Sequence, residues 1–178
     1  MSSIIVRFAT KYDIPFILKM HPYSKSKISF PFEEDILVAE RDGKVLGAVS
    51  VGHKDVAYAS GELSARVVAD MHLQHVNAKM PKFSGCWVSK LYVLAEHRCQ
   101  GIATKLVKES LECMKENGFT EACAGINIKN EMKTVSQHVF EKNGFKKFGS
   151  CICPLPKGCC RGVILKKTIR LLGRERMK

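Results

Sequence analysis

Residues 86–118 of the chain read CWVSKLYVLAEHRCQGIATKLVKESLECMKENG. The run Cys86–Leu94 is largely apolar, which predicts a buried strand. Over Ala103–Asn117, apolar side chains recur at helical spacing and lysine and glutamate side chains fill the opposite face, which predicts an amphipathic helix that ends at Gly118. A short turn that contains Gly101 joins the strand to the helix. A strand, a glycine turn and a helix in this order are typical of an α/β fold.

Patterns outside this stretch predict the remaining elements. Asp13 can cap a helix that has Pro15 in its first turn, and Asp42-Gly43 is a favoured turn for a hairpin. A second amphipathic helix ends at Asn143-Gly144, and its apolar stripe carries Met132, Val135, Ser136, Val139 and Phe140. The other predicted strands are Ile4–Phe8, Ile36–Glu40, Lys44–Val51, Ala122–Ile128, Phe148–Ile152 and Arg161–Ile169.

These elements predict an α/β (mixed α+β) fold with a central mixed sheet of about seven strands and helices on both faces. No linker, repeat or low-complexity tract divides the sequence. We therefore expect one domain over residues 1–178, with an insertion at 54–85 between the third and fourth strands.

The composition is that of an ordinary globular protein with an excess of positive charge. Hydrophobic residues make up 46% of the 178 residues, and the formal net charge is +12. This charge predicts attraction to anions such as a phosphorylated cofactor, whereas no basic run carries the interleaved aromatic residues typical of nucleic-acid binding. No stretch approaches the ~18 apolar residues of a membrane helix, and the first residues do not resemble a signal peptide. We expect a cytoplasmic protein, monomeric or homodimeric, that binds neither nucleic acid nor membrane.

The eight cysteines fit a reducing compartment, since most lie in apolar strands or helices, where cysteine behaves as a small hydrophobic residue. Four of them lie close together near the C-terminus and could ligate a metal: Cys151, Cys153, Cys159 and Cys160. The paired C-x₂-C spacing of zinc sites is missing, and no histidine lies nearby. A strand pair around residues 154–158 is therefore favoured, and no metal is expected.

The turn after the strand at residues 86–94 has the features of a phosphate site. Its glycine permits close approach of the backbone, and the first amides of the following helix have no partner within that helix. Positively charged side chains add to the partial positive charge of the helix start. The eight residues of this turn are Arg98, Cys99, Gln100, Gly101, Ile102, Ala103, Thr104 and Lys105. Their pattern is neither a Walker loop nor a dinucleotide-binding G-x-G-x-x-G turn.

Two segments together resemble the GNAT acetyltransferase superfamily. Arg98, Gly101 and Ala103 follow Leu91-Tyr92-Val93 in the arrangement of the family's coenzyme A (CoA) motif, (Arg or Gln)-x-x-Gly-x-(Gly or Ala). Residues 139–145, VFEKNGF, are similar to the Tyr-Glu-Lys-x-Gly-Phe end of the family's fourth helix. The separation of the motifs and the order of the predicted elements also match the family over nearly the whole chain.

The resemblance implies the GNAT acyltransferase fold, acetyl-CoA as co-substrate and direct transfer of acetyl to an amine. In this family the fourth strand and the next strand splay apart, and pantetheine lies in the gap. By this likeness Leu91, Tyr92 and Val93 contact pantetheine and acetyl, with an amide near Val93 polarising the thioester carbonyl. The turn residues from Arg98 to Lys105 would hold the pyrophosphate.

The acid–base residues depart from the usual pattern of the family. Phe140 stands where many members have a tyrosine acid, and a phenyl ring cannot donate a proton. Ser136 lies one turn earlier, at the place where insect-type arylalkylamine N-acetyltransferases carry a serine, although Met132 replaces their second serine. Ser136 is the candidate acid. The alternative is a structural role, in which its hydroxyl donates a hydrogen bond to a carbonyl of its own helix. The same subfamily uses a glutamate near the start of its second helix as the base, and by this likeness Glu34 is the candidate; capping of a helix start is the alternative. Four further residues remain open as the base: Glu33, His72, His75 and His138.

Three functions compete. The insertion at 54–85 and Ser136 favour acetylation of a small, arylalkylamine-like primary amine. The same chemistry on a protein N-terminus or lysine is the second possibility. The third is a catalytically weak acyl-CoA-binding sensor, which the absent tyrosine favours.

Overall fold

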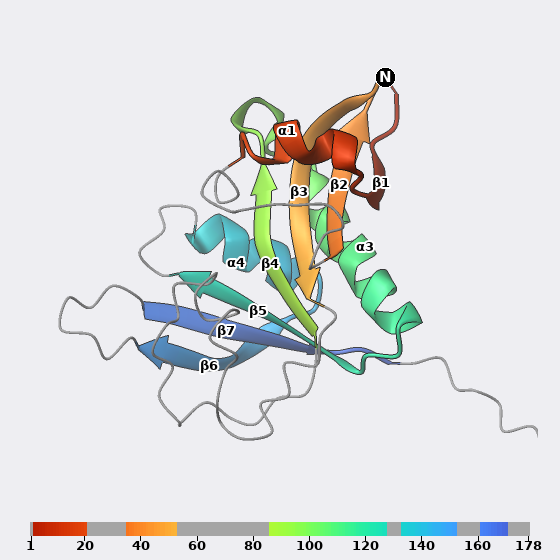
Figure 1. The fold of residues 1–178 in the computed structure, drawn as a ribbon. Helices are drawn as coiled ribbons and strands as arrows, with labels where there is room; N and C mark the ends of the chain where they lie inside the picture. The colour runs from red at the N-terminus through yellow and green to blue at the C-terminus, as the bar shows by residue number, and fades with distance from the viewer. Residues whose placement is uncertain (1, 21–34, 53–85, 128–132, 153–160, 171–178) are drawn as a thin grey trace, which may run out of the picture.

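The computed structural model describes residues 2–20, 35–52, 86–127, 133–152 and 161–170. A seven-stranded sheet runs through the molecule in the order β1-β2-β3-β4-β5-β7-β6 (Figure 1). All neighbouring strands are antiparallel except β4 and β5, which are parallel. The mixed sheet of about seven strands is thus confirmed. Its strands are β1 (Ile5–Phe8), β2 (Asp35–Arg41), β3 (Lys44–Gly52), β4 (Cys86–Val93), β5 (Glu121–Asn127), β6 (Lys146–Ile152) and β7 (Arg161–Thr168).

The helices agree closely with the predicted ones. The described helices and 3-10 turns are η1 (Lys11–Asp13), α1 (Ile14–Ile17), η4 (Ala95–His97), α3 (Ile102–Glu116) and α4 (Lys133–Lys142). Gly118 and Gly144 follow α3 and α4 with φ of 81° and 83°, the left-handed conformation that ends a helix readily at glycine. The predicted ends of both helices are therefore confirmed.

The β2–β3 hairpin forms as predicted. Asp42 and Gly43 have φ of 53° and 73°, as a two-residue turn with both central residues left-handed requires. The second strand of the hairpin, β3, pairs with β4 on its other edge. At Gly47 the backbones of β3 and β4 are very close. A Cβ at Gly47 would lie 2.7 Å from the Tyr92 carbonyl oxygen, so only glycine fits at this point of the sheet.

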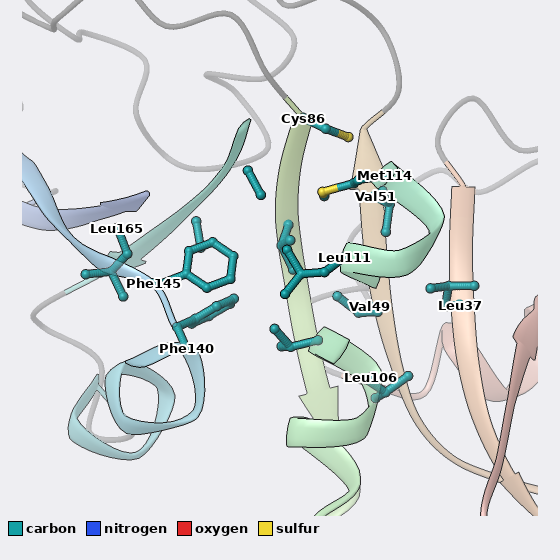
Figure 2. Packing of buried hydrophobic residues seen from close by; sticks show 14 of the residues in the cluster. Leu37, Val49, Val51, Cys86, Leu106, Leu111, Met114, Phe140, Phe145 and Leu165 are labelled. Carbon is teal, nitrogen blue, oxygen red and sulfur yellow. The ribbon is translucent and has the colours of Figure 1, made fainter. Parts of the chain in front are cut away.

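The two faces of the sheet are covered by different helices. Figure 2 shows Leu106, Leu111 and Met114 of α3 packed beside Val49 and Val51 of β3, within a core that also includes residues of α4. Each such leucine, fully buried, contributes roughly 1.5–3 kcal/mol of transfer free energy. Among the described residues, the buried cluster on this face is larger than the one on the opposite face.

The opposite face is covered by α1. Ile17 and the nearby Met20 are buried there with Ile36 and Val38, whereas Leu37 between them belongs to the α3 face. This alternation is the two-residue period of a strand that is buried on both sides. The prediction of helices on both faces of the sheet is therefore confirmed.

Asp13 has a different role from the predicted one. It lies at the start of α1, but its side chain makes no capping hydrogen bond to that helix. Instead its carboxylate accepts hydrogen bonds from the Thr10 N–H at 2.7 Å and from the Arg7 guanidinium at 2.8 and 2.9 Å. The hydrogen bonds from Arg7 are the largest cause of the low pKa of Asp13, about 2. This partly buried ion pair thus ties η1 to β1.

The prediction for Val135 is wrong. It was expected on the buried stripe of α4, yet it is 52% exposed. Phe140 is buried and Val139 packs partly against the core. Among the described elements, α4 packs mainly against α3 and β5, so a narrow stripe of the helix is covered by them and Val135 lies outside it. The predicted insertion at 54–85 lies outside the described residues.

Candidate active site

The strands β4 and β5 are paired over only part of their length. Their register joins Cys86 to Ala122, Trp87 to Cys123 and Val88 to Ala124, and the two described strands share no further pair. Beyond Val88 they diverge, as the view of β4 and β5 in Figure 1 shows. The splay that the family resemblance implied is therefore present in this chain.

A β-bulge in β4 accounts for the divergence. Ser89 pairs with Ser50 and Tyr92 pairs with Ala48, so two residues of β4, Lys90 and Leu91, lie opposite the single residue Val49. Lys90 has φ of 50°, a left-handed conformation that is uncommon for a residue with a side chain. An extra residue of this kind bends the strand that carries it, here where β4 separates from β5.

The end of β4 presents backbone polar groups to the divergence. The N–H of Leu94 donates to the Leu46 carbonyl oxygen at 2.9 Å, on the β3 side. Because successive residues of a strand direct their polar groups to opposite edges, those of Val93 face the β5 side. A hydrogen bond from the Arg98 Nε to the Val93 carbonyl oxygen, at 3.2 Å, is consistent with this direction.

The turn before α3 is shaped by two left-handed residues. Cys99 has φ of 61°, and Gly101, at the N-cap of α3, has φ of 78° and ψ of 0°. The first intrahelical bond runs from the Lys105 N–H to the Gly101 carbonyl at 3.0 Å, which leaves the N–H groups of residues 102–104 without an intrahelical acceptor. A Cβ at Gly101 would meet no atom within 4 Å, so the turn opens onto free space. This geometry fits a phosphate group.

The sequence itself decides the family. Residues 33–147 match the family model described as an acetyltransferase (GNAT) domain, and these residues make up well over half of the chain. The chain belongs to the GNAT acetyltransferase family. It is accordingly an acetyl-CoA-dependent N-acetyltransferase, with acetyl-CoA as its co-substrate.

Solved structures share the fold of this GNAT chain. An N-acetyltransferase from Staphylococcus aureus superposes with a TM-score of 0.63 at 20% identity, covering 95% of this chain and 100% of its own. A ribosomal-protein-alanine N-acetyltransferase from Brucella melitensis gives 0.62 at 20% identity, with 92% and 99% covered. The yncA protein from Salmonella typhimurium, solved with acetyl-CoA, gives 0.63 at 16% identity, with 95% of both chains covered. A search of curated protein sequences finds no significant match.

Two cations predicted at the turn are engaged within this GNAT domain. The Arg98 guanidinium lies 5.5 Å from the centroid of the Tyr92 ring, in addition to its bond to Val93. The Lys105 ammonium donates to the Ile4 carbonyl oxygen, just before β1. The structure instead brings a third cation to the turn, because the Arg41 guanidinium contacts the Gln100 side chain. Sequence reasoning missed Arg41, which lies 59 residues before Gln100.

Phe140 occupies the usual tyrosine position as part of the core. It is 4% exposed, and its ring meets the Phe145 ring edge-on, with centroids 5.1 Å apart (Figure 2). Ser136 is half-buried one turn earlier on α4, and within the described part of the chain its hydroxyl has no hydrogen-bond partner. Ser110 of α3 differs, since its hydroxyl donates to the Leu106 carbonyl at 2.8 Å. His138 is exposed, as the sequence suggested.

Other predicted residues lie outside the described residues: Glu33, Glu34, His72, His75, Met132, Cys153, Cys159 and Cys160. Among the described residues no helix is long and apolar enough to cross a membrane. A hollow of about 370 Å³ lies at the β6–β7 end of the sheet and is lined by Gly144, Lys146, Lys147, Phe148, Lys166, Lys167, Thr168 and Arg170. None of the candidate cofactor-binding or catalytic residues lines it.

Proposed function

We propose that this GNAT enzyme transfers acetyl directly from acetyl-CoA to the primary amine of a small, arylalkylamine-like acceptor. The observation that carries the direct transfer is the divergence of β4 from β5 beside the turn that opens α3. It provides one continuous path from a phosphate-binding turn to the edge of β4 that β5 leaves unpaired. Both reactants can be held side by side along this path, and such proximity is worth up to ~7–11 kcal/mol of the barrier in favourable cases.

The cofactor contacts in this proposal come from two segments. The backbone of Leu91, Tyr92 and Val93 binds pantetheine, and the Val93 N–H donates to the thioester oxygen as charge develops on it. The turn supplies the pyrophosphate site through its open amides and nearby cations: Arg98, Cys99, Gln100, Gly101, Ile102, Ala103, Thr104 and Lys105. The divergence of β4, the two left-handed residues of the turn and the open space at Gly101 support this assignment.

Residue types near the divergence favour an apolar acceptor. Leu91, Tyr92 and Leu94 are all half-buried, and β4 carries no carboxylate anywhere between Cys86 and Val93. A polyamine would need acidic side chains to hold its several charges, whereas one amine on an aromatic or aliphatic body suits these surroundings.

An amine panel tests the acceptor. Release of free thiol from acetyl-CoA should be at least tenfold faster, as kcat/KM, with phenylethylamine-type or indolylethylamine-type substrates than with spermidine or with peptides that carry a free N-terminal alanine. A higher rate on the peptides would contradict the small-amine proposal and support a protein N-acetyltransferase. That second candidate has its own support, because a structural neighbour of similar fold is a ribosomal-protein-alanine N-acetyltransferase.

Ser136 and Glu34 take the acid and base roles in the proposal. The amine nitrogen attacks the carbonyl carbon of the thioester, the C–S bond breaks, and the nitrogen loses one proton while the sulfur gains one. Glu34 removes the proton from the amine, and Ser136 donates one to the thiolate. The half-buried position of Ser136, together with the absence of a hydrogen-bond partner among the described residues, supports its role.

Replacing Ser136 by alanine should lower kcat by roughly 10²-fold, the effect of a lost proton donor, with the KM for acetyl-CoA unchanged. Ser136→Thr, which keeps a hydroxyl, should recover part of the rate. His138→Ala on the exposed side of the same helix is the matched control and should retain full activity. A Ser136→Ala protein that keeps the kcat of the unaltered enzyme would exclude Ser136 as the acid.

We also propose that residues 1–178 form one cytoplasmic domain in which residues 54–85 are an insertion between β3 and β4. Two observations support a single domain. The strands between Ile5 and Thr168 all belong to one sheet, and the family match runs across residues 54–85.

A further inference from the structure

We propose that Arg41 binds a phosphate group of CoA and is a residue of the cofactor site. The inference rests on the proposed assignment of the turn before α3 as the pyrophosphate site. It adds to that site a cation from the β2–β3 hairpin.

The position of Arg41 follows from the sheet. It is the last residue of β2 and pairs with Lys44 across the hairpin turn. Its two terminal guanidinium nitrogens lie 3.3 and 3.4 Å from the Gln100 Oε1. Gln100 stands between Cys99 and Gly101, the two left-handed residues of the turn. The guanidinium of Arg41 is therefore at the edge of the turn itself.

The guanidinium of Arg41 is only partly satisfied. Its Nε is buried and has no hydrogen-bond partner, and both other nitrogens share one neutral amide oxygen at long distance. Arg7 shows the alternative, since it is paired with Asp13 at 2.8 Å and with Glu40 at 2.7 Å. Within the described part of the chain, Arg41 makes no ion pair with a carboxylate. A phosphate at the two outer nitrogens would give this charged group the charge-assisted acceptors that the neutral Gln100 oxygen does not supply.

The other cations of the turn are less available. Arg98 is bound to the Val93 carbonyl and stacked near Tyr92, and Lys105 is bound to the Ile4 carbonyl. A guanidinium has a planar set of donors that matches two oxygens of one phosphate. The weak contact to Gln100 exchanges readily for such a pair of charge-assisted bonds. Arg41 is accordingly the cation best placed to receive a phosphate.

Titration calorimetry with CoA tests the proposal without any turnover. Arg41→Gln should raise the Kd for CoA on the order of tenfold, because charge-assisted bonds to phosphate are lost. Lys44→Gln removes the same charge from an exposed residue of the same hairpin and should change the Kd less than twofold. Arg41→Lys keeps the charge but loses the paired donors and should give an intermediate Kd; it also serves if the glutamine variant fails to fold.

Dephospho-CoA, which lacks the 3′-phosphate but keeps the pyrophosphate, identifies the phosphate. If Arg41→Gln weakens CoA but not dephospho-CoA, Arg41 binds the 3′-phosphate; equal weakening of both assigns it to the pyrophosphate. A folded Arg41→Gln protein with a Kd for CoA within twofold of the unaltered protein overturns the proposal. If Gly101→Glu loses CoA binding in the same series, the assignment of the turn to the pyrophosphate stands whatever the result for Arg41. If the unaltered protein fails to bind CoA, the assignment of the turn and the proposal for Arg41 are both overturned.

Discussion

Gly101→Glu should abolish measurable acetyl-CoA binding while the domain still folds. Gly101 has φ of 78°, so any side chain there adds strain of about 1–2 kcal/mol. A Cβ at this position meets open space, so the glutamate can be accommodated without a clash. Its carboxylate would then occupy the positive end of α3 that the pyrophosphate needs. We expect the Kd to rise more than about 100-fold, or roughly 2.7 kcal/mol, as measured by calorimetry.

The other end of the same helix provides the control. Gly118 has φ of 81° and open space at its Cβ position, so Gly118→Glu introduces the same strain and charge. That variant should lose similar stability but bind acetyl-CoA normally. Gly101→Ala separates strain from charge and should weaken binding much less than the glutamate. Unchanged affinity in Gly101→Glu would refute the assignment of this turn to the cofactor.

Phe140→Ala should lower the free energy of unfolding by about 3–5 kcal/mol, the cost of removing a phenyl ring from a packed core. The ring is 4% exposed and lies edge-on to Phe145, so the cavity cannot fill with solvent at low cost. Because native domains are stable by only ~5–15 kcal/mol, this loss is a large part of the total. Urea unfolding followed by circular dichroism measures it.

A second variant separates packing from chemistry at Phe140. Phe140→Leu keeps an apolar side chain of nearly the same size and should cost less than about 1.5 kcal/mol. Its kcat should stay within threefold of the unaltered enzyme, because a phenyl ring neither donates nor accepts the protons of the reaction. A folded Phe140→Leu protein that has lost turnover would show that the ring positions a reactant.

Much of the fold could be predicted because its signals are local. The apolar period of residues 103–117 predicted α3 to within one residue at each end, and Asp42-Gly43 predicted the hairpin. Side-chain partners were harder. Asp13 was expected to cap a helix and instead pairs with Arg7, and Val135 was expected in the core and is exposed. Both errors have one cause: the pattern of one segment does not say which neighbouring segment covers it.

The candidate site divides in the same way. The turn at residues 98–105 could be recognised from sequence, because a glycine between a strand and a helix is a feature of consecutive residues. The contact between Arg41 and Gln100 could not, since it depends on the register of β2, β3 and β4. The engagement of Lys105 by the Ile4 carbonyl likewise joins residues that are far apart in the chain.

The strand, glycine turn and helix at residues 86–118, and with them the family and the co-substrate, were determined by the sequence alone, because periodicity and turn chemistry act between near neighbours. Only the tertiary structure decided where β4 leaves β5 and which cations face the turn. The bulge at Lys90 and Leu91 bends β4 where it separates from β5, and the paired strands carry Arg41 to Gln100. Such positions follow from how whole strands align and bend, and no single segment of the chain contains that information.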